Sequence, residues 1–208
     1  MRSTTTRLSV ADLDDLVAVM SDSFHDYPVM RYVLGEKQPY DDRLPRLVEL
    51  FVSGRAYRNE PMIGIHDASG TLVGAATMTL PTPTDPPPDF VALRDAVWAE
   101  LGADARERYD EFVAATQQFA IGPPHYHLNM IGVRRSHQGL GLARTLLDAV
   151  HDLSAADERS SGVSLTTERP ANVELYQHFG YRVTGRARVG DAFDTWTLFR
   201  PQNPRTRE

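Results

Sequence analysis

The sequence predicts a mixed α/β protein, an α+β mixed sheet flanked by helices and interrupted by a helical insertion. Three observations support this prediction. Strand-like and helix-like segments alternate along most of the 208 residues. A strand at 125–133 runs into a glycine-containing turn and then an amphipathic helix. A proline-rich break at 81–90 precedes about thirty residues with helical periodicity.

The N-terminal part predicts one short strand and three helices. The segment 4–10 has strand character, and apolar side chains recur at helical spacing across 10–28. Shorter helical patterns cover 29–35, which ends at a glycine, and 41–58. Two strands, 61–67 and 70–81, follow around a turn rich in Asp, Ser and Gly.

The remaining chain predicts the insertion and a second group of elements. The insertion covers about 81–121 and is helical from 90 to 119. After the strand at 125–133 and its helix come a strand at 162–167, a short helix at 172–180 and a hairpin of 181–189 with 193–200. We expect a single domain over 1–200 and a C-terminal tail at 201–208.

Composition excludes several classes of function. The chain has no cysteine, which rules out disulfides, thiolate metal sites and a cysteine nucleophile. Its net charge is −6 and it contains no basic run, so we expect no nucleic-acid partner. No window reaches the ~18 apolar residues of a membrane span. We therefore expect no membrane association and a cytoplasmic location.

The stretch RRSHQGLGLARTLL, residues 134–147, allows three interpretations. The stretch is a turn between a strand and a helix, a dinucleotide-binding motif, or a loop that binds a pyrophosphate. The dinucleotide-binding motif needs a third glycine where this chain has Arg144. A pyrophosphate fits a helix N-terminus with unpaired N–H groups, provided that small residues let the phosphate approach. The pattern Gln/Arg-x-x-Gly-x-Gly/Ala is met by Gln138, Gly141 and Ala143.

A second segment, ERPANVELYQHFGYRV, carries Asn172, Tyr176, Gly180 and Tyr181 at the spacing Asn-x-x-x-Tyr-x-x-x-Gly-Phe/Tyr. Together the two segments resemble the coenzyme A loop and the following segment of the GNAT acetyltransferase superfamily. The resemblance covers nearly all of the chain, except for the insertion. It implies the GNAT acyltransferase fold, a mixed, mostly antiparallel sheet with the helical insertion between the third and fourth strands. It also implies acetyl-CoA as cosubstrate and no metal.

Within the superfamily, the chain resembles the puromycin N-acetyltransferases and related small-molecule acetyltransferases. FHDYPVMRYVL, the insertion, GVRRSHQGLG and NVELYQHFGYRVT carry this likeness. The chain departs from the expected pattern at Thr166, where we expect an acidic residue in the puromycin enzyme. The resemblance therefore leaves the identity of the acceptor amine open.

The resemblance also implies a set of cofactor-binding residues. Backbone N–H groups of Ile131 and Val133 would pair with the pantetheine arm, and the Ile131 amide would stabilise the acetyl oxygen. Tyr176 would be the general acid for the leaving thiolate, although a core tyrosine is the alternative. The full set is Ile131, Gly132, Val133, Arg134, Gln138, Gly139, Leu140, Gly141, Leu142, Ala143, Arg144, Asn172 and Tyr176.

The general base is expected to be His127, with Glu168 as the second choice. His127 precedes Gln138 by the spacing of the catalytic glutamate in histone-type members of the superfamily. Strand alternation predicts that His127, Asn129 and Ile131 share one face. Because His127 would lie ~13 Å along the strand from Ile131, we expect an ordered water to relay the proton. The alternative is that His127 has only a structural role, with its ring hydrogen-bonded at the end of the strand. His125 and His127 form an H-x-H pair, but no third metal ligand is suitably spaced.

The segment after the first long helix lies where the family places the acceptor pocket. Its candidate residues are Phe24, Asp26, Tyr27 and Tyr32, with Asp26 facing an ammonium group. We expect an N-acetyltransferase that moves acetyl from acetyl-CoA to a primary amine of a small molecule. Acetylation of a protein N-terminus or lysine, and a non-catalytic acyl-CoA sensor, are the alternatives. We expect a monomer or a homodimer.

Overall fold

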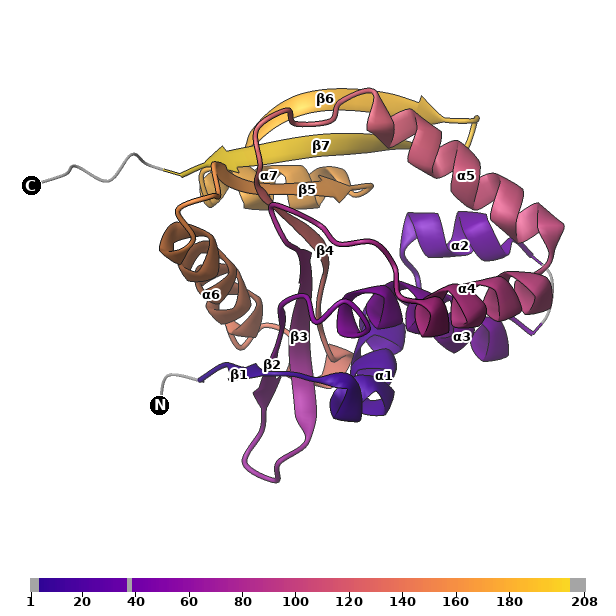
Figure 1. The fold of residues 1–208 in the computed structure, drawn as a ribbon, viewed down its shortest axis with the longest axis horizontal. Coiled ribbons are helices and arrows are strands. Elements are labelled where there is room, and N and C mark those ends of the chain that lie inside the picture. Colours follow the sequence, from indigo (N-terminus) through magenta and orange to yellow (C-terminus); the bar gives the residue numbers. More distant parts are fainter. Residues whose placement is uncertain (1–3, 37–38, 203–208) are drawn as a thin grey trace, which may run out of the picture.

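The computed structural model describes residues 4–36 and 39–202, which form a seven-stranded sheet with helices on both faces (Figure 1). The strand order is β1 (Thr6–Arg7), β2 (Met62–His66), β3 (Leu72–Thr79), β4 (Tyr126–Val133), β5 (Gly162–Thr167), β7 (Phe193–Pro201) and β6 (Arg182–Val189). Neighbouring strands are antiparallel except β4 and β5, which are parallel. The predicted mixed, mostly antiparallel sheet is therefore confirmed.

The helices also follow the predicted order. They are α1 (Leu13–Phe24), α2 (Pro28–Leu34), α3 (Tyr40–Ala56), α4 (Pro88–Leu101), α5 (Ala103–Gln117), α6 (Leu142–Ala156) and α7 (Pro170–His178). The first strand is shorter than predicted, because Val10–Asp12 forms a 3-10 turn instead. Ser9 caps this turn: its hydroxyl accepts the Ala11 amide at 3.2 Å, and its own amide donates to Asp12 at 2.7 Å.

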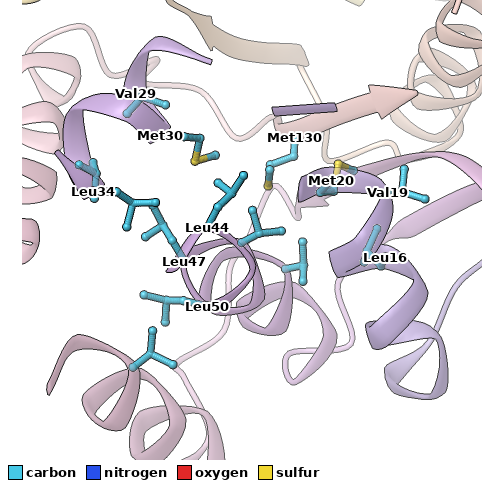
Figure 2. Close-up of a cluster of buried hydrophobic side chains, with 14 of the residues drawn as sticks. Leu16, Val19, Met20, Val29, Met30, Leu34, Leu44, Leu47, Leu50 and Met130 are labelled. Carbon is cyan, nitrogen blue, oxygen red and sulfur yellow. The ribbon is translucent and has the colours of Figure 1, made fainter. Parts of the chain in front are cut away.

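Two apolar cores lie on opposite faces of the sheet. One joins α1, α2, α3 and α4, and the other joins α6 and α7 to the central strands. Figure 2 shows the first core, where Leu44 and Leu47 of α3 lie between side chains from α1 and α2, with Met130 of β4 above them. The sheet is thus held from both sides, which fixes the positions of β4 and β5 between the two cores.

The insertion forms α4 and α5, which lie between β3 and β4 in sequence as predicted. The two helices are separated at Gly102, whose φ of +91° favours glycine. From there α5 runs from the neighbourhood of α2 toward β6 and β7 (Figure 1). At one end Arg108 donates to the carbonyl of Val33 at 2.9 Å. Beyond the other end Phe119 covers Gly185, where a Cβ atom would lie 2.1 Å from the ring.

Within residues 4–36 and 39–202, no helix combines the length and apolar character that a membrane span requires. Pro201, expected in the tail, is the last residue of β7, and the amide of Gln202 donates to the carbonyl of Ser161 at 2.8 Å. The rest of the predicted tail, 203–208, lies outside the described residues.

Candidate active site

The two central parallel strands separate from each other partway along their length. β4 and β5 pair only from Tyr126 to Leu128 on β4, although β4 continues to Val133. The next amide after the strand, that of Arg134, donates to Val73 of β3 at 2.8 Å. Because N–H groups alternate between the two edges of a strand, the amides of Ile131 and Val133 point away from β3, into the opening. This is the arrangement expected for these two amides.

A β-bulge in β4 overturns the prediction that His127, Asn129 and Ile131 share one face. Thr77 pairs with Met130 but Met78 pairs with Leu128, so Asn129 is an extra residue in the strand. The side chains of Leu128 and Ile131 consequently contact the same core, against α6, despite their odd spacing. His127 therefore lies on the face opposite Ile131, and strict alternation from the sequence was wrong here.

The glycine-containing loop presents a row of unpaired amides at the start of α6. Gly139 and Gly141 have φ values of +79° and +78°, which disfavour any side chain. No backbone hydrogen bond within the described residues uses the amides of residues 139–143 as donors. The side-chain amide of Gln138 folds back onto the carbonyl of Val133 at 3.2 Å and fixes the loop to the end of β4.

Other predicted cofactor residues have structural partners. The Arg134 side chain donates to the carbonyl of Leu72 at 2.8 Å, and the guanidinium of Arg144 lies 5.5 Å from the ring centre of Phe179. Gly132 permits close packing of α1, because a Cβ atom there would lie 2.7 Å from Oγ of Ser23. These contacts explain the three residues without reference to a ligand.

A cavity of about 490 Å³ lies at the opening between β4 and β5. Its walls come from α1 and the start of α2, the end of α3, β4, β5, α7, and from α5 with the segment that follows it. Apolar and aromatic side chains dominate the lining. Among the predicted residues, the cavity brings together Phe24, Tyr27, His127, Ile131, Glu168, Asn172 and Tyr176.

Tyr176 projects from α7 into this cavity and its ring is almost fully buried. Its hydroxyl has no hydrogen-bond partner in the part of the chain that the structure describes. Burial, and then the nearby charge of Glu168, raises the pKa of the phenol well above its usual range, so the hydroxyl stays protonated at neutral pH. Asn172, one turn earlier, donates to Oγ1 of Thr167 at 3.2 Å.

Glu168 lies just beyond the end of β5, and 6% of its surface is exposed. Its Oε1 accepts a hydrogen bond from the hydroxyl of buried Thr195 at 2.8 Å. Burial raises the pKa of the carboxyl to about 7, although this hydrogen bond opposes the shift. A carboxyl with such a pKa exchanges protons near neutral pH, as a general base must.

His127 is held by Ser164, whose Oγ lies 2.8 Å from its Nδ1. Burial lowers the pKa of His127 to about 4, and the charges of His125 and Arg55 contribute to the shift. The ring is therefore neutral at pH 7 and a weak base.

In the described part of the chain, no three His, Asp or Glu side chains are grouped as metal ligands would be.

The four candidate acceptor residues divide into two pairs. Phe24 and Tyr27 line the cavity, and the Tyr27 hydroxyl lies 2.9 Å from Oγ1 of Thr167 and accepts the Glu168 amide at 3.2 Å. Asp26 and Tyr32 are not part of the lining, so the geometry does not support the prediction that places them there.

Asp26 forms ion pairs with Arg31 at 2.6 Å and Arg135 at 2.9 Å, and the Arg31 hydrogen bond is the main reason that its pKa falls to about 2. This carboxylate joins the turn after α1 to the loop before α6. The hydroxyl of Tyr32 donates to Glu111 of α5 and so attaches α2 to the insertion.

Several lining residues were not identified from the sequence. Tyr109, Phe112 and Thr116 of α5 close one side of the cavity, and Arg55 at the end of α3 adds a guanidinium. Oγ1 of Thr197 on β7 is buried at the cavity without a hydrogen-bond partner among the described residues. Only the helical periodicity of the insertion was visible in the sequence, and periodicity does not reveal which distant strand a helix face will cover.

Comparisons with known families and solved structures show what the chain is similar to. The model of a family described as "Acetyltransferase (GNAT) domain" matches residues 105–196, which begin within α5 and contain β4, the loop, α6, β5, α7 and β6. No curated protein matches the chain.

Solved structures share the fold at low sequence identity. One from Corynebacterium glutamicum, described as "histone acetyltransferase HPA2 and related acetyltransferase", is 21% identical with a TM-score of 0.68 over 99% of each chain. The ribosomal-protein-S18-alanine N-acetyltransferase from Escherichia coli is 14% identical with a TM-score of 0.57, also over 99% of each chain. A phosphinothricin acetyltransferase from Sinorhizobium meliloti, in complex with AcCoA, is 14% identical with a TM-score of 0.54, over 98% of this chain and 90% of that one.

Proposed function

We propose that the chain is an acetyltransferase of the GNAT type, which transfers the acetyl group of acetyl-CoA to a primary amine of a small molecule; the match of the GNAT domain model to residues 105–196 and the shared fold support this. One observation carries the proposal. The unpartnered hydroxyl of Tyr176 and the carboxyl of Glu168, with its pKa of about 7, line one cavity together with Ile131, whose amide points into the opening of the sheet. An acid, a base and an oxyanion donor are the groups that acyl transfer to an amine requires.

The residues of the loop fit a coenzyme A pyrophosphate. Five consecutive amides, 139–143, are free to donate, and they lie at the N-terminus of a fifteen-residue helix. Such a terminus carries about half a positive charge and binds anions. No Cβ atom at Gly139 or Gly141 would meet another atom within 4 Å, so the approach to the loop is open. Acetyl-CoA, when bound, supplies the acetyl group as a thioester.

Each proton in the proposed reaction has an assigned residue. The nitrogen of the acceptor amine bonds to the acetyl carbon, and the carboxylate of Glu168 accepts the proton that this nitrogen loses. The bond between the acetyl carbon and the sulfur then breaks. The Ile131 amide donates a hydrogen bond to the acetyl oxygen, and Tyr176 donates its proton to the departing sulfur. We prefer Glu168 to His127 as the base, because a histidine with a pKa of about 4 holds a proton weakly at pH 7.

The enclosure of the cavity supports a small acceptor. Side chains of α5 and residues 119–121 form part of its wall, and the volume of about 490 Å³ suits a small molecule. An extended peptide would need a groove that is open at both ends, whereas this cavity is closed on one side by the insertion.

The proposal is tested by incubating the protein with acetyl-CoA and two sets of acceptors, small primary amines and short peptides with free N-termini or lysines. We expect N-acetylated products from small amines, with kcat/KM at least ten times that of the best peptide. Faster transfer to peptides would overturn the small-molecule assignment. Tight binding of acetyl-CoA with no transfer to any acceptor would indicate a sensor instead.

A further inference from the structure

Two side chains that can carry opposite charges line the cavity. One is Glu168, which lies just before α7 and lines the cavity together with Tyr176. Arg55, at the C-terminal end of α3, lines the cavity beside β4, where its Nη1 lies 3.5 Å from Oδ1 of Asn129 and also donates to Thr79. The side chain of Arg55 is 18% exposed, and guanidinium donors that are largely removed from water need hydrogen-bond partners.

Part of the guanidinium is already used. Its Nε lies 3.0 Å from Oε2 of Glu60, whose side chain is 1% exposed, but the contact lacks the geometry of a hydrogen bond. Nη1 is engaged by Thr79 and Asn129. Nη2 has no hydrogen-bond partner within residues 4–36 and 39–202. This amino group is therefore available to a group inside the cavity, and guanidinium nitrogens bind carboxylate oxygens strongly.

The sheet indicates how far Glu168 lies from the strand position beside Arg55. Asn129, which contacts Arg55, follows the last residue of β4 that pairs with β5, and that pair is Leu128 with Leu165. Glu168 lies three residues beyond Leu165, which corresponds to ~10 Å along an extended strand. Aliphatic and aromatic side chains, among them Phe24, Phe51 and Phe112, contribute most of the remaining lining.

We propose that the acceptor is an amino carboxylate, in which an apolar or aromatic spacer separates the primary amine from the acid. Its amine lies at Glu168, and its carboxylate accepts hydrogen bonds from Nη2 of Arg55. The proposal rests on the acetyl transfer proposed above and adds the class of acceptor to it. Arg55 is thus a determinant of acceptor specificity and has no part in the proton transfers.

Two probes of nearly equal shape test the acceptor class. 4-(Aminomethyl)benzoate carries the acid, and 4-methylbenzylamine has a methyl group in its place. The wild-type protein should acetylate the acid with a kcat/KM about 10- to 100-fold higher, the range expected for a hydrogen bond to a charged group. Equal kcat/KM values for the two probes would overturn the proposal.

The matched variants isolate Arg55. Removing Arg55 alone would leave Glu60 charged and buried, so we choose the double variant R55Q/E60Q, which replaces the ion pair by two neutral amides. The ratio of the two kcat/KM values should fall about 10- to 100-fold in this variant. If the double variant does not fold, R55K takes its place. It keeps the charge opposite Glu60 but removes the paired guanidinium donors, so the ratio of the two kcat/KM values should fall less than 10- to 100-fold but should still fall.

Arg58 provides the control. It lies three residues after Arg55, its guanidinium donates to the carbonyls of Gly54 and Thr84, and it does not line the cavity. R58Q removes a neighbouring positive charge and should leave the ratio as in the wild type. A ratio that falls in R58Q as much as in R55Q/E60Q would show that the general field, and not Arg55, selects the acid, and would overturn the proposal.

Binding separates this proposal from the failure of acetyl transfer. If neither amine is acetylated, the proposed function fails, and the affinity for 4-methylbenzoate then tests Arg55 directly. The wild type should bind 4-methylbenzoate about 10-fold more tightly than 4-methylbenzamide, and R55Q/E60Q should bind the two equally. Equal affinities in the wild type would overturn the assignment of Arg55.

Discussion

Thr195 donates a hydrogen bond of 2.8 Å from its hydroxyl to Oε1 of Glu168, and both side chains are buried. The hydrogen bond stabilises the carboxylate, whereas burial destabilises it, and burial is the larger effect. The resulting pKa of about 7 allows Glu168 to gain and lose a proton in the pH range where the protein would act. The predictions about pH and stability depend on the balance between burial and this contact.

The first prediction identifies the base. In the wild type, kcat/KM should rise with pH through a group near 7, because only the carboxylate form of Glu168 accepts the amine proton. Glu168→Gln should remove this dependence and lower kcat about 10²–10⁴-fold. His127→Gln should keep the dependence, because His127 is neutral throughout this range. The opposite pattern, with the dependence lost only in His127→Gln, would make the histidine the base.

The second prediction concerns the hydrogen bond itself. Thr195→Val keeps the shape of the side chain but removes the donor that stabilises the carboxylate. The pKa of Glu168 should therefore rise further, and the pH dependence of kcat/KM should move to higher pH. The shift is measured from pH profiles of the two proteins. A profile that stays in place, or moves to lower pH, would contradict the role assigned to Thr195.

The third prediction is about stability. The pKa of Glu168 is about 7 in the folded protein and near 4.5 when exposed, so the folded state binds the extra proton between these values. Stability should therefore fall as pH rises from below 4.5 to above 7, by about 3 kcal/mol from this group. Glu168→Gln should remove this fall, as measured by urea denaturation at both ends of the range. Parallel curves for the two proteins would contradict the raised pKa.

The fourth prediction concerns the general acid. Tyr176→Phe removes the unpartnered hydroxyl and keeps the ring that packs against Tyr181 at 5.6 Å. We expect kcat to fall about 10²–10⁴-fold, while the affinity for coenzyme A and the melting temperature change little. Turnover and calorimetry on the same preparation give both quantities. A kcat close to that of the wild type would assign Tyr176 to the core alone.

The fifth prediction tests the loop with a matched pair of glycines. Gly141→Val should abolish coenzyme A binding, because a valine disfavours the φ of +78° and would displace the free amides. Gly70→Val provides the control: Gly70 has a φ of +83° and equally open surroundings, but lies in the turn between β2 and β3. Calorimetry should show normal affinity in Gly70→Val. Equal losses in both variants would show that strain alone is responsible.

The sequence by itself determined the elements and the loop. Helical periodicity, turn residues and the proline break depend on neighbours within one turn or one strand, so α1–α7 and the strands could be predicted with errors mainly at the ends. The same holds for Gly139 and Gly141, since their positive φ values are a local property. Tyr176 and Glu168 were also named from the sequence, and the structure places both at the cavity.

Only the tertiary structure decided which groups meet and what their proton affinities are. The bulge at Asn129 reversed the face of His127 relative to Ile131, because it depends on the pairing of β4 with β3. We now prefer Glu168 to His127 as the general base, because burial lowers the pKa of His127 and raises the pKa of Glu168. Arg55 and α5 reach the cavity through contacts between residues far apart in the chain, which no local pattern encodes. Desolvation and long-range packing are properties of the assembled fold, and for this reason they appeared only there.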